Sequence, residues 1–539
     1  MRWTASWSWL SLTALAVACG GSGGSSGPGF DAGSGAGDGG DDGSQGTCAT
    51  PRMACGGGCV DTTSDPANCG ACGASCGSGA SCCGGSCATS CSFVLSSIDP
   101  AQAYQNGGAF ITLHGTGFAS GMRAAIGDGR APVWALDAQT ARIMVPPAPI
   151  GTYDVTVSLG ANSSTRKGAL LYKAGGLLTP WLQKPMSSVR GEAPGVAVMQ
   201  DGRVLIAGGT LVPDVSTMSL ATADVFDRKN NDATQAVVSK QATPRWRNTA
   251  VTLLDGRVLV VGGGCQPDMT GCGGDPSLAD LFDPATETFT PTASPLNKPR
   301  VGTMAVLLPD GRALIASSND PSLEVFDPAT GAFTLVPHAQ PHPFGFLVRM
   351  RDGRILLGAG ASLDVSVPPV ATVELIDPES LSFSTIGSLT TARGFPTAHV
   401  LPDGRTLVIA GTSTAGGCGA PLSTIEVVDA KAQGVAPSSM KLAVTRCWQA
   451  SALVRDGSVL VMGGYFTGQC GGGGITAQVE RIDPVAGVVA PFASLPNANA
   501  EWNAVTLLDG SVLGVGGGSC GTPSALPDLD FLPADPTSQ

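Results

Sequence analysis

The feature of this sequence that most constrains its fold is the dipeptide Asp-Gly, which recurs seven times immediately before an apolar run. Its aspartates are Asp201, Asp255, Asp310, Asp352, Asp403, Asp456 and Asp509, at spacings of 54, 55, 42, 51, 53 and 53 residues. Such self-similarity indicates a repeat architecture. Each unit contains an apolar strand, the Asp-Gly hairpin turn, a second strand ending in glycines or small residues, and further strands. Four-stranded units of this size predict the blades of a seven-bladed β-propeller.

The sequence also predicts how the ring of blades closes. The seventh unit stops after its third strand, near residues 528–532. Residues 178–185 precede the first unit and are similar to the fourth strand of other units, such as residues 289–295. We therefore expect residues 178–185 to complete the seventh blade, which leaves no open strand edge.

Double glycines end the second strand of several units, at residues 208–209, 262–263, 463–464 and 516–517. On these repeats, residues 175–539 resemble Kelch and galactose-oxidase-type propellers. The copper of galactose oxidase is held by two tyrosines and two histidines. Residues 175–539 contain one tyrosine, Tyr465, and three histidines, His338, His342 and His399. We therefore expect neither this copper site nor another metal or cofactor.

Residues 92–174 predict a second β domain, because runs such as 110–114 and 153–157 alternate apolar and polar side chains between glycine and proline turns. The pieces Ile98-Asp-Pro100, 111–118 and 151–155 resemble the IPT/TIG immunoglobulin-like family, which implies a β-sandwich acting as a spacer or adhesion module. With 13% charged residues, 76 glycines and 39 prolines, the whole chain is expected to be all-β.

The N-terminal sequence indicates where in the cell the protein is located. Residues 1–18 carry one positive charge followed by an apolar run too short to span a bilayer, and Cys19 follows. This pattern resembles a bacterial lipoprotein signal peptide, which implies export, a lipid on Cys19 and attachment to the outer membrane or cell surface. The alternative is an ordinary secretory signal with an incidental cysteine. Residues 19–47 are rich in Gly, Ser and Asp and predict a flexible linker.

Ten cysteines lie within residues 48–91, where aliphatic side chains are scarce. In an exported chain this density predicts disulfides that replace a hydrophobic core. Zinc is the alternative, because Cys69 and Cys72 have metal-ligand spacing. The fold class is thus an all-β chain: a disulfide-rich segment, an immunoglobulin-like sandwich and a seven-bladed propeller.

The loops after the double glycines differ in length and composition, and antiparallel pairing places them together on one face of the propeller, opposite the Asp-Gly turns. We name it the variable face. Four units begin with an arginine ten residues before the Asp-Gly turn, which places it near the central channel on this face. The candidate ligand-binding residues are these arginines with nearby aromatic residues: Arg245, Trp246, Arg300, Arg393, Arg446, Trp448, Tyr465 and Trp502.

Two interpretations of these residues remain open. The arginines could form a ring of donors for an anionic or glycan ligand, with tryptophans stacking on sugars. Alternatively, a side chain repeated in most blades ties the scaffold together. Among the propeller cysteines, Cys265 and Cys272 share one loop and are expected to pair, and one further pair is expected among Cys418, Cys447 and Cys470.

The formal net charge of −12 and the lack of a basic run argue against nucleic acid as a partner. No catalytic motif was found, so the sequence favours a monomeric, non-catalytic surface protein that presents its propeller to a glycan or a protein. Two alternatives remain: an extracellular carbohydrate-active hydrolase or lyase with a site in the channel, and a purely structural envelope protein.

Overall fold

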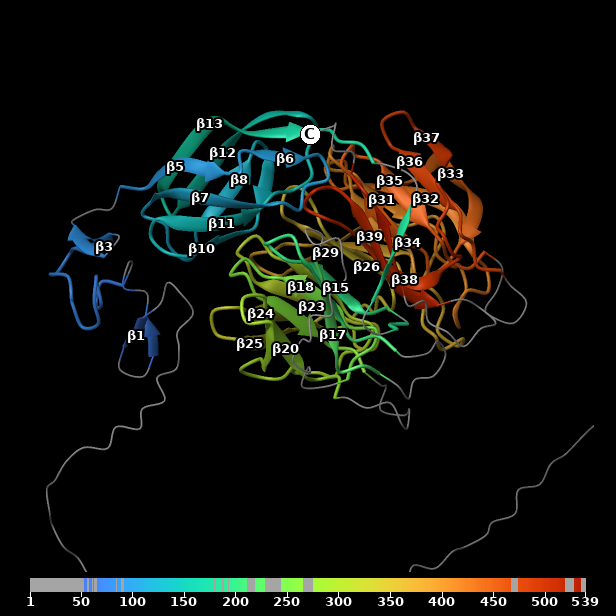
Figure 1. The fold of residues 1–539 in the computed structure, drawn as a ribbon, viewed down its shortest axis with the longest axis horizontal. Coiled ribbons are helices and arrows are strands. Elements are labelled where there is room, and N and C mark those ends of the chain that lie inside the picture. Colours follow the sequence, from blue (N-terminus) through green and yellow to red (C-terminus); the bar gives the residue numbers. More distant parts are fainter. Residues whose placement is uncertain are drawn as a thin grey trace, which may run out of the picture. The chain divides into compact units, whose positions relative to one another are not determined.

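The computed structural model describes residues 53–55, 58–60, 62, 65–83, 85–88, 92–177, 181–186, 189–191, 193–210, 219–227, 244–264, 275–466, 474–518 and 528–534. The secondary-structure elements in these ranges are β-strands, as Figure 1 shows. Within them, no helix has the length and apolarity needed to cross a membrane. The predicted all-β class is confirmed. The expected signal peptide, Cys19 lipidation site and linker lie outside the described residues.

The cysteine-rich segment consists of two short hairpins crossed by disulfides. The hairpins are β1 (Met53–Cys55) with β2 (Gly58–Val60), and β3 (Ser81–Cys83) with β4 (Ser86–Ala88). The disulfides are Cys55–Cys72, Cys69–Cys82 and Cys76–Cys87. The sulfur atoms of Cys69, Cys76 and Cys87 lie within 4.8 Å of one another. Because each of these sulfurs is already bonded to another sulfur, disulfides rather than zinc hold this segment together.

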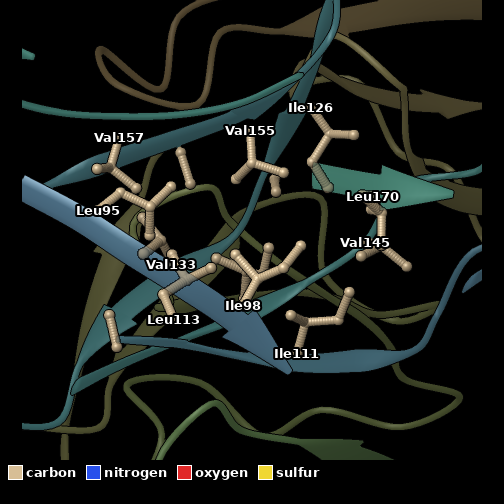
Figure 2. Packing of buried hydrophobic residues seen from close by; sticks show 14 of the residues in the cluster. Leu95, Ile98, Ile111, Leu113, Ile126, Val133, Val145, Val155, Val157 and Leu170 are labelled. Atoms are coloured by element: carbon tan, nitrogen blue, oxygen red, sulfur yellow. The ribbon is translucent and has the colours of Figure 1, made fainter. Parts of the chain in front are cut away.

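Two sheets form the predicted sandwich. One has the strand order β10 (Val133–Ala135), β11 (Thr140–Met144), β7 (Phe110–Thr116) and β5 (Val94–Asp99). The other has the order β6 (Gln102–Tyr104), β13 (Asn162–Lys173), β12 (Gly151–Leu159), β8 (Arg123–Ile126) and β9 (Gly129–Ala131). Figure 2 shows Ile111, Leu113, Val155 and Val157, all 0% exposed, meeting in the core. The alternating pattern of these strands therefore places one apolar face inward on each sheet.

Seven sheets follow the sandwich, one for each repeat. The first four blades, from the inner strand outward, are β15 (Gly195–Val198), β16 (Val204–Ala207), β17 (Ala223–Phe226); β18 (Thr249–Thr252), β19 (Val258–Val261), β20 (Ala279–Asp283), β21 (Thr288–Pro291); β22 (Met304–Leu307), β23 (Ala313–Ala316), β24 (Leu323–Asp327), β25 (Ala332–Val336); and β26 (Phe346–Arg349), β27 (Ile355–Gly358), β28 (Thr372–Ile376), β29 (Phe383–Ser388). The last three are β30 (Thr397–Val400), β31 (Thr406–Ile409), β32 (Leu422–Asp429), β33 (Gly434–Arg446); β34 (Ala450–Leu453), β35 (Val459–Met462), β36 (Val479–Asp483), β37 (Val488–Phe492); and β38 (Ala500–Thr506), β39 (Val512–Gly518), β40 (Asp528–Leu532), β14 (Leu182–Pro185). A seven-bladed propeller is thereby confirmed.

The second strand of each blade explains the apolar runs after the Asp-Gly turns. Each residue of β16, β19, β23, β27, β31 and β35 is buried. A strand in the middle of a blade is covered on both faces by neighbouring blades, so it carries a continuous apolar run instead of an alternating one. The repeated pattern in the sequence is therefore a direct consequence of blade stacking.

The ring closes as predicted. β14, from the start of the propeller, pairs antiparallel with β40 from its end, in the register Leu182 to Phe531. The inner strands contact one another in sequence order, and β38 also contacts β15, which completes the circle. Figure 1 shows β15, β18, β26, β34 and β38 among these inner strands. No blade edge is left open at the junction, and the two ends of the domain stabilise each other.

The sandwich docks on the Asp-Gly face of the propeller. The backbone N–H of Arg130 donates to the carbonyl of Arg351 at 2.8 Å, and that of Val133 donates to the carbonyl of Pro309 at 3.1 Å. The carboxylate of Asp128 forms a salt bridge with the guanidinium of Arg351, with an N–O distance of 2.6 Å. The partly buried rings of Phe110 and Trp134 pack against the core of blades two and three. The sandwich thus covers the end of the central channel on this face.

The closing strand should be a main determinant of propeller stability. Trp181, just before β14, is buried, and its indole N–H donates to the carbonyl of Ala493 at 2.8 Å. We expect Trp181→Ala to lower the free energy of unfolding by about 3 kcal/mol, because a large buried ring and its hydrogen bond are lost. Chemical denaturation of the full chain measures this. The exposed neighbour Gln183 is the control, and Gln183→Ala should change stability by less than about 0.5 kcal/mol; equal effects would contradict the prediction.

Candidate functional site

The four predicted arginines lie inside the blades. Arg245, Arg300, Arg393 and Arg446 are all 0% exposed. Each forms a salt bridge with a carboxylate on the third strand of its own blade: Asp280, Glu324, Glu426 and Glu480, respectively. Their guanidinium groups therefore offer no donor to a ligand on the variable face, and the structure assigns them to the scaffold.

Backbone contacts show what these arginines do. The Arg446 guanidinium donates to the carbonyl of Gly463, at the end of the second strand, and to the carbonyl of Gln478, before the third. Arg245 makes the equivalent bonds to Gly262 and Leu278. Each arginine thus provides hydrogen-bond donors for carbonyls on both sides of the loop between the second and third strands. Backbone pairing between these two strands ends at this place.

The sequence pattern of these arginines was incomplete. Arg190, eleven residues before its turn, pairs with Asp224 in blade one in the same way. In blade four the position is occupied by His342, and in blade seven by Asn499. The Asn499 amide donates to the carbonyl of Gly516, at the end of the second strand. A neutral side chain thus makes one of the backbone bonds that arginine makes in other blades.

Blade four replaces the arginine with two histidines. The Nε2 atoms of His338 and His342 lie 3.0 and 2.8 Å from the same carboxylate oxygen of Glu374. Burial alone would lower the pKa of His338, but its hydrogen bond to Glu374 and the charge of that carboxylate outweigh burial and raise it. Burial raises the pKa of Glu374, but its hydrogen bonds to His338 and His342 and their charges lower it to about 2.

The salt bridge of blade four should therefore respond to pH, whereas the arginine salt bridges of the other blades should not. A raised histidine pKa stabilises the fold below about pH 6.5, and this contribution is lost as pH rises through the folded pKa. The lowered pKa of Glu374 contributes stability at pH values above the ordinary pKa of a glutamate. This contribution is lost only as the pH falls toward 2. We expect Glu374→Gln to destabilise the protein more at pH 5.5 than at pH 9, measured by denaturant unfolding.

The matched control is Glu426→Gln in blade five, where the partner is Arg393. Because arginine stays charged across this range, the substitution should cost about 3 kcal/mol at both pH values. A pH-independent cost for Glu374→Gln would contradict the assigned role of the histidines.

A second repeat position forms a ring at the mouth of the channel on the variable face. It lies two residues after the arginine position, and in blade one three after Arg190. It comes just before the inner strand in blades one to six and at the start of β38 in blade seven. Its members are Ala193, Arg247, Gly302, Phe344, Phe395, Trp448 and Glu501. All have positive φ, between 36° and 59°, and six are not glycine. This conformation costs about 1 kcal/mol or more for each side-chain-bearing residue, and such clusters of strain are typical of functional sites.

Backbone hydrogen bonds join members of this ring from blade to blade. The N–H of Phe395 donates to the carbonyl of Phe344, that of Glu501 to Trp448, and that of Ala193 to Glu501. The last bond crosses the junction between blades seven and one. Left-handed backbone at this position thus turns peptide groups toward the next blade, and the side chains meet around the channel axis.

Five ring members make what we call the mouth cluster: Arg247, Phe344, Phe395, Trp448 and Glu501. The rings of Phe395 and Trp448 stack at a centroid distance of 4.1 Å, and Phe344 lies 4.9 Å from Phe395. The Arg247 guanidinium lies 4.9 Å from the centre of the Trp448 ring. An aromatic platform beside a cation is thereby assembled from blades that are distant in sequence.

A carboxylate completes the mouth cluster. Glu501 lies 3.6 Å from the Arg247 guanidinium and accepts a hydrogen bond of 3.2 Å from the hydroxyl of Tyr465. The Arg247 and Glu501 side chains keep 13% and 17% of their surface exposed, and Phe344 and Trp448 are also only partly buried. The five residues of the mouth cluster therefore offer donors, acceptors and aromatic faces, and their two charges balance.

A buried disulfide lies next to the mouth cluster. Cys418, in the loop of blade five, is bonded to Cys447, next to Trp448. Both cysteines are buried together with Phe395 and Tyr465. The expected pair among Cys418, Cys447 and Cys470 is thus confirmed as Cys418–Cys447, whereas Cys470, Cys265 and Cys272 lie outside the described residues.

The other predicted aromatic residues have different places. Trp448 lies in the mouth cluster, and Tyr465 is buried below it. Trp246 is 7% exposed and lies under Arg247, whose guanidinium is 4.4 Å from the Trp246 ring. Trp502 is 4% exposed and belongs to the core of blades six and seven. Of these three tryptophans, only Trp448 is partly exposed at the mouth.

Sequence reasoning missed Arg247, Phe344, Phe395 and Glu501. A signal for them was present, because all stand at a fixed offset from the arginine position. The signal was not evident because the residue type at this position differs between blades. The position holds alanine, arginine, glycine, phenylalanine, tryptophan or glutamate. The arginine position repeats one residue type in five of the seven blades, whereas this position repeats only its backbone conformation.

Comparison with known proteins assigns one domain. Residues 94–173 match the family model of the IPT/TIG domain. The sandwich is an IPT/TIG domain. The match spans the strands β5 to β13 and confirms the immunoglobulin-like resemblance. No match to the chain was found among curated proteins.

Two solved structures that match the chain share only a general likeness with it. A fungal alcohol oxidase of the AA5 family, in complex with copper, has 14% identity and a TM-score of 0.38, covering 82% of this chain and 76% of that one. The structure of YjhT has 12% identity and a TM-score of 0.41, covering 65% of this chain and 99% of that one. At these values the likeness carries no functional argument, and the propeller assignment depends on the sheets described above.

The residues of this propeller do not fit a copper centre of tyrosines and histidines. Tyr465 donates to Glu501 at the mouth, His338 and His342 bond Glu374 inside blade four, and His399 lies on an inner strand, 2.6 Å from the hydroxyl of Ser451. Within the described part of the propeller, these four side chains do not converge on one point.

Proposed function

We propose that this protein is an exported surface protein that binds a neutral glycan at the mouth of its propeller. The observation that carries the proposal is the mouth cluster, where the partly exposed rings of Phe344 and Trp448, joined through the buried ring of Phe395, form a platform beside Arg247 and Glu501. Aromatic faces bind the apolar faces of sugar rings, while a fixed donor and acceptor recognise hydroxyl groups.

Charge favours a neutral ligand over a polyanion. The charge of Arg247 is balanced by Glu501 at 3.6 Å, and the four arginines that could have formed a cationic ring are buried in salt bridges. The positive φ of six ring residues holds the side chains in place before binding, which lowers the entropy that a ligand has to offset.

Export is supported by the disulfides of the cysteine-rich segment and of the propeller, since such bonds persist in oxidising compartments. We further propose that a lipid on Cys19 anchors the protein to the outer membrane or cell surface. Replacement of that residue, Cys19→Ala, should then move the protein from the membrane fraction to the soluble exported fraction, as followed by immunoblotting. Retention of the variant in the membrane fraction would contradict the anchor.

Glycan binding is tested with the full exported chain, disulfides intact, on neutral β-glucan, chitin and mannan oligosaccharides, followed by calorimetry on those that bind. We expect Trp448→Ala to raise the dissociation constant about tenfold, because a stacking ring contributes about 1 kcal/mol or more to binding. Arg247→Met should weaken binding by a similar factor through loss of a charged hydrogen-bond donor.

The control is Val485→Ser, which removes an apolar side chain that is 95% exposed on a turn of blade six, on the opposite face. This variant should bind like the wild type. Binding of none of these glycans by the wild type, or equal loss in all three variants, would contradict the proposal and favour a protein partner or a structural role.

A further inference from the structure

A cavity of about 480 Å³ lies on the propeller axis between the inner strands and the IPT/TIG domain. Its wall includes residues from all seven inner strands and, from the sandwich, Tyr104, Asn106, Phe110 and Met144. Small and aliphatic side chains dominate the wall, and none of the lining residues is an aspartate or glutamate. A space of this volume and character is typical of a small-molecule site.

One lining residue, Arg349, is anomalous for the scaffold. It stands three residues before the Asp-Gly turn of blade four. The equivalent positions are all uncharged: Val198, Thr252, Leu307, Val400, Leu453 and Thr506. The blade therefore does not need a cation at this position, and Arg349 has a role that the repeat does not explain.

Arg349 also lacks a partner. Among the described residues its guanidinium makes no hydrogen bond or salt bridge, and its buried Nη1 atom is unsatisfied. By contrast, Arg190, Arg245, Arg300, Arg393 and Arg446 each hold a carboxylate. A half-buried cation in an apolar cavity without a counter-charge is costly, so this group points to an anion that comes from outside the chain.

The neighbouring polar groups fit a single negative charge. His399 lies on the same wall, and burial lowers its pKa to about 4, so it is neutral near pH 7 and adds no second positive charge. The Nε2 atom of His399 and the hydroxyl of Ser451 are 2.6 Å apart and satisfy each other. Arg349 is the one cation among the residues that line the cavity.

We propose that this cavity binds a small organic carboxylate, held by Arg349 through its carboxylate group and by the apolar wall through a compact hydrocarbon body. A planar guanidinium matches a carboxylate with two parallel hydrogen bonds. One cation balances one carboxylate but not a phosphate dianion, and the apolar wall favours a hydrocarbon over a hydrated inorganic ion. This site lies at the Asp-Gly end of the channel and is independent of the mouth cluster.

The test uses the full chain after exhaustive dialysis, with hexanoate and benzoate as probes and with hexanamide, chloride and phosphate as comparison compounds. We expect both carboxylates to bind in calorimetry and to raise the melting temperature, and hexanamide, chloride and phosphate to do neither. Arg349→Met should weaken carboxylate binding about tenfold or more, because a charge-assisted bond is lost. Without ligand, this variant should melt at the same temperature as the wild type or higher.

Ala305→Leu provides a second variant, because it fills the cavity from the inner strand of blade three and leaves Arg349 unchanged. It should also abolish carboxylate binding. Failure of the wild type to bind either carboxylate, an equal response to hexanamide or to inorganic anions, or carboxylate binding that survives in Arg349→Met would overturn the proposal. Glycan binding at the mouth should be unaffected by Arg349→Met, so this proposal and the glycan proposal fail separately.

Discussion

The propeller depends on one interaction that recurs in six of its seven blades: a buried arginine or histidine just before the inner strand, bonded to a carboxylate on the third strand and to backbone carbonyls beside the intervening loop. Arginine performs this role in blades one, two, three, five and six, and histidine in blade four. Charged groups are costly to bury alone, and their pairing with several hydrogen bonds satisfies each strand end where the sheet stops. These contacts fix the strand ends from which the long loops of the variable face extend. The loops can therefore differ in length and sequence without disrupting the blade.

This scaffold explains the contrast between two neighbouring repeat positions. The arginine position holds its side chain inside the blade, and arginine is repeated there in five of the seven blades, with His342 in blade four and Asn499 in blade seven. The mouth position, two residues later in six blades, turns its side chain toward the channel axis and is fixed only in its backbone conformation. Its residues are free to differ, and their combination produces a platform of Phe344, Phe395 and Trp448 with a balanced charge pair.

The axis of the propeller therefore has two ends with different characters. At the variable face, aromatic and charged side chains meet at a partly exposed mouth. At the Asp-Gly face, the IPT/TIG domain covers a cavity with one unpaired cation, Arg349. The sandwich is thus more than a spacer along the chain, because it forms part of the cavity wall and bonds to loops of several blades through residues such as Asp128 and Arg130.

The sequence by itself determined the blade count, the closing strand and the sandwich, because hairpin turns, apolar runs and glycines are local signals that act over a few residues. It also located the arginines but could not decide their role, since burial depends on neighbours that are distant in sequence. Only the tertiary structure decided that Arg446 lies inside a blade while Trp448 reaches the mouth, and that the sandwich meets the Asp-Gly face. The physical reason is that these arrangements depend on the packing of blades into a closed ring, which brings together side chains from seven units. The first and last of these units lie more than 300 residues apart in the sequence.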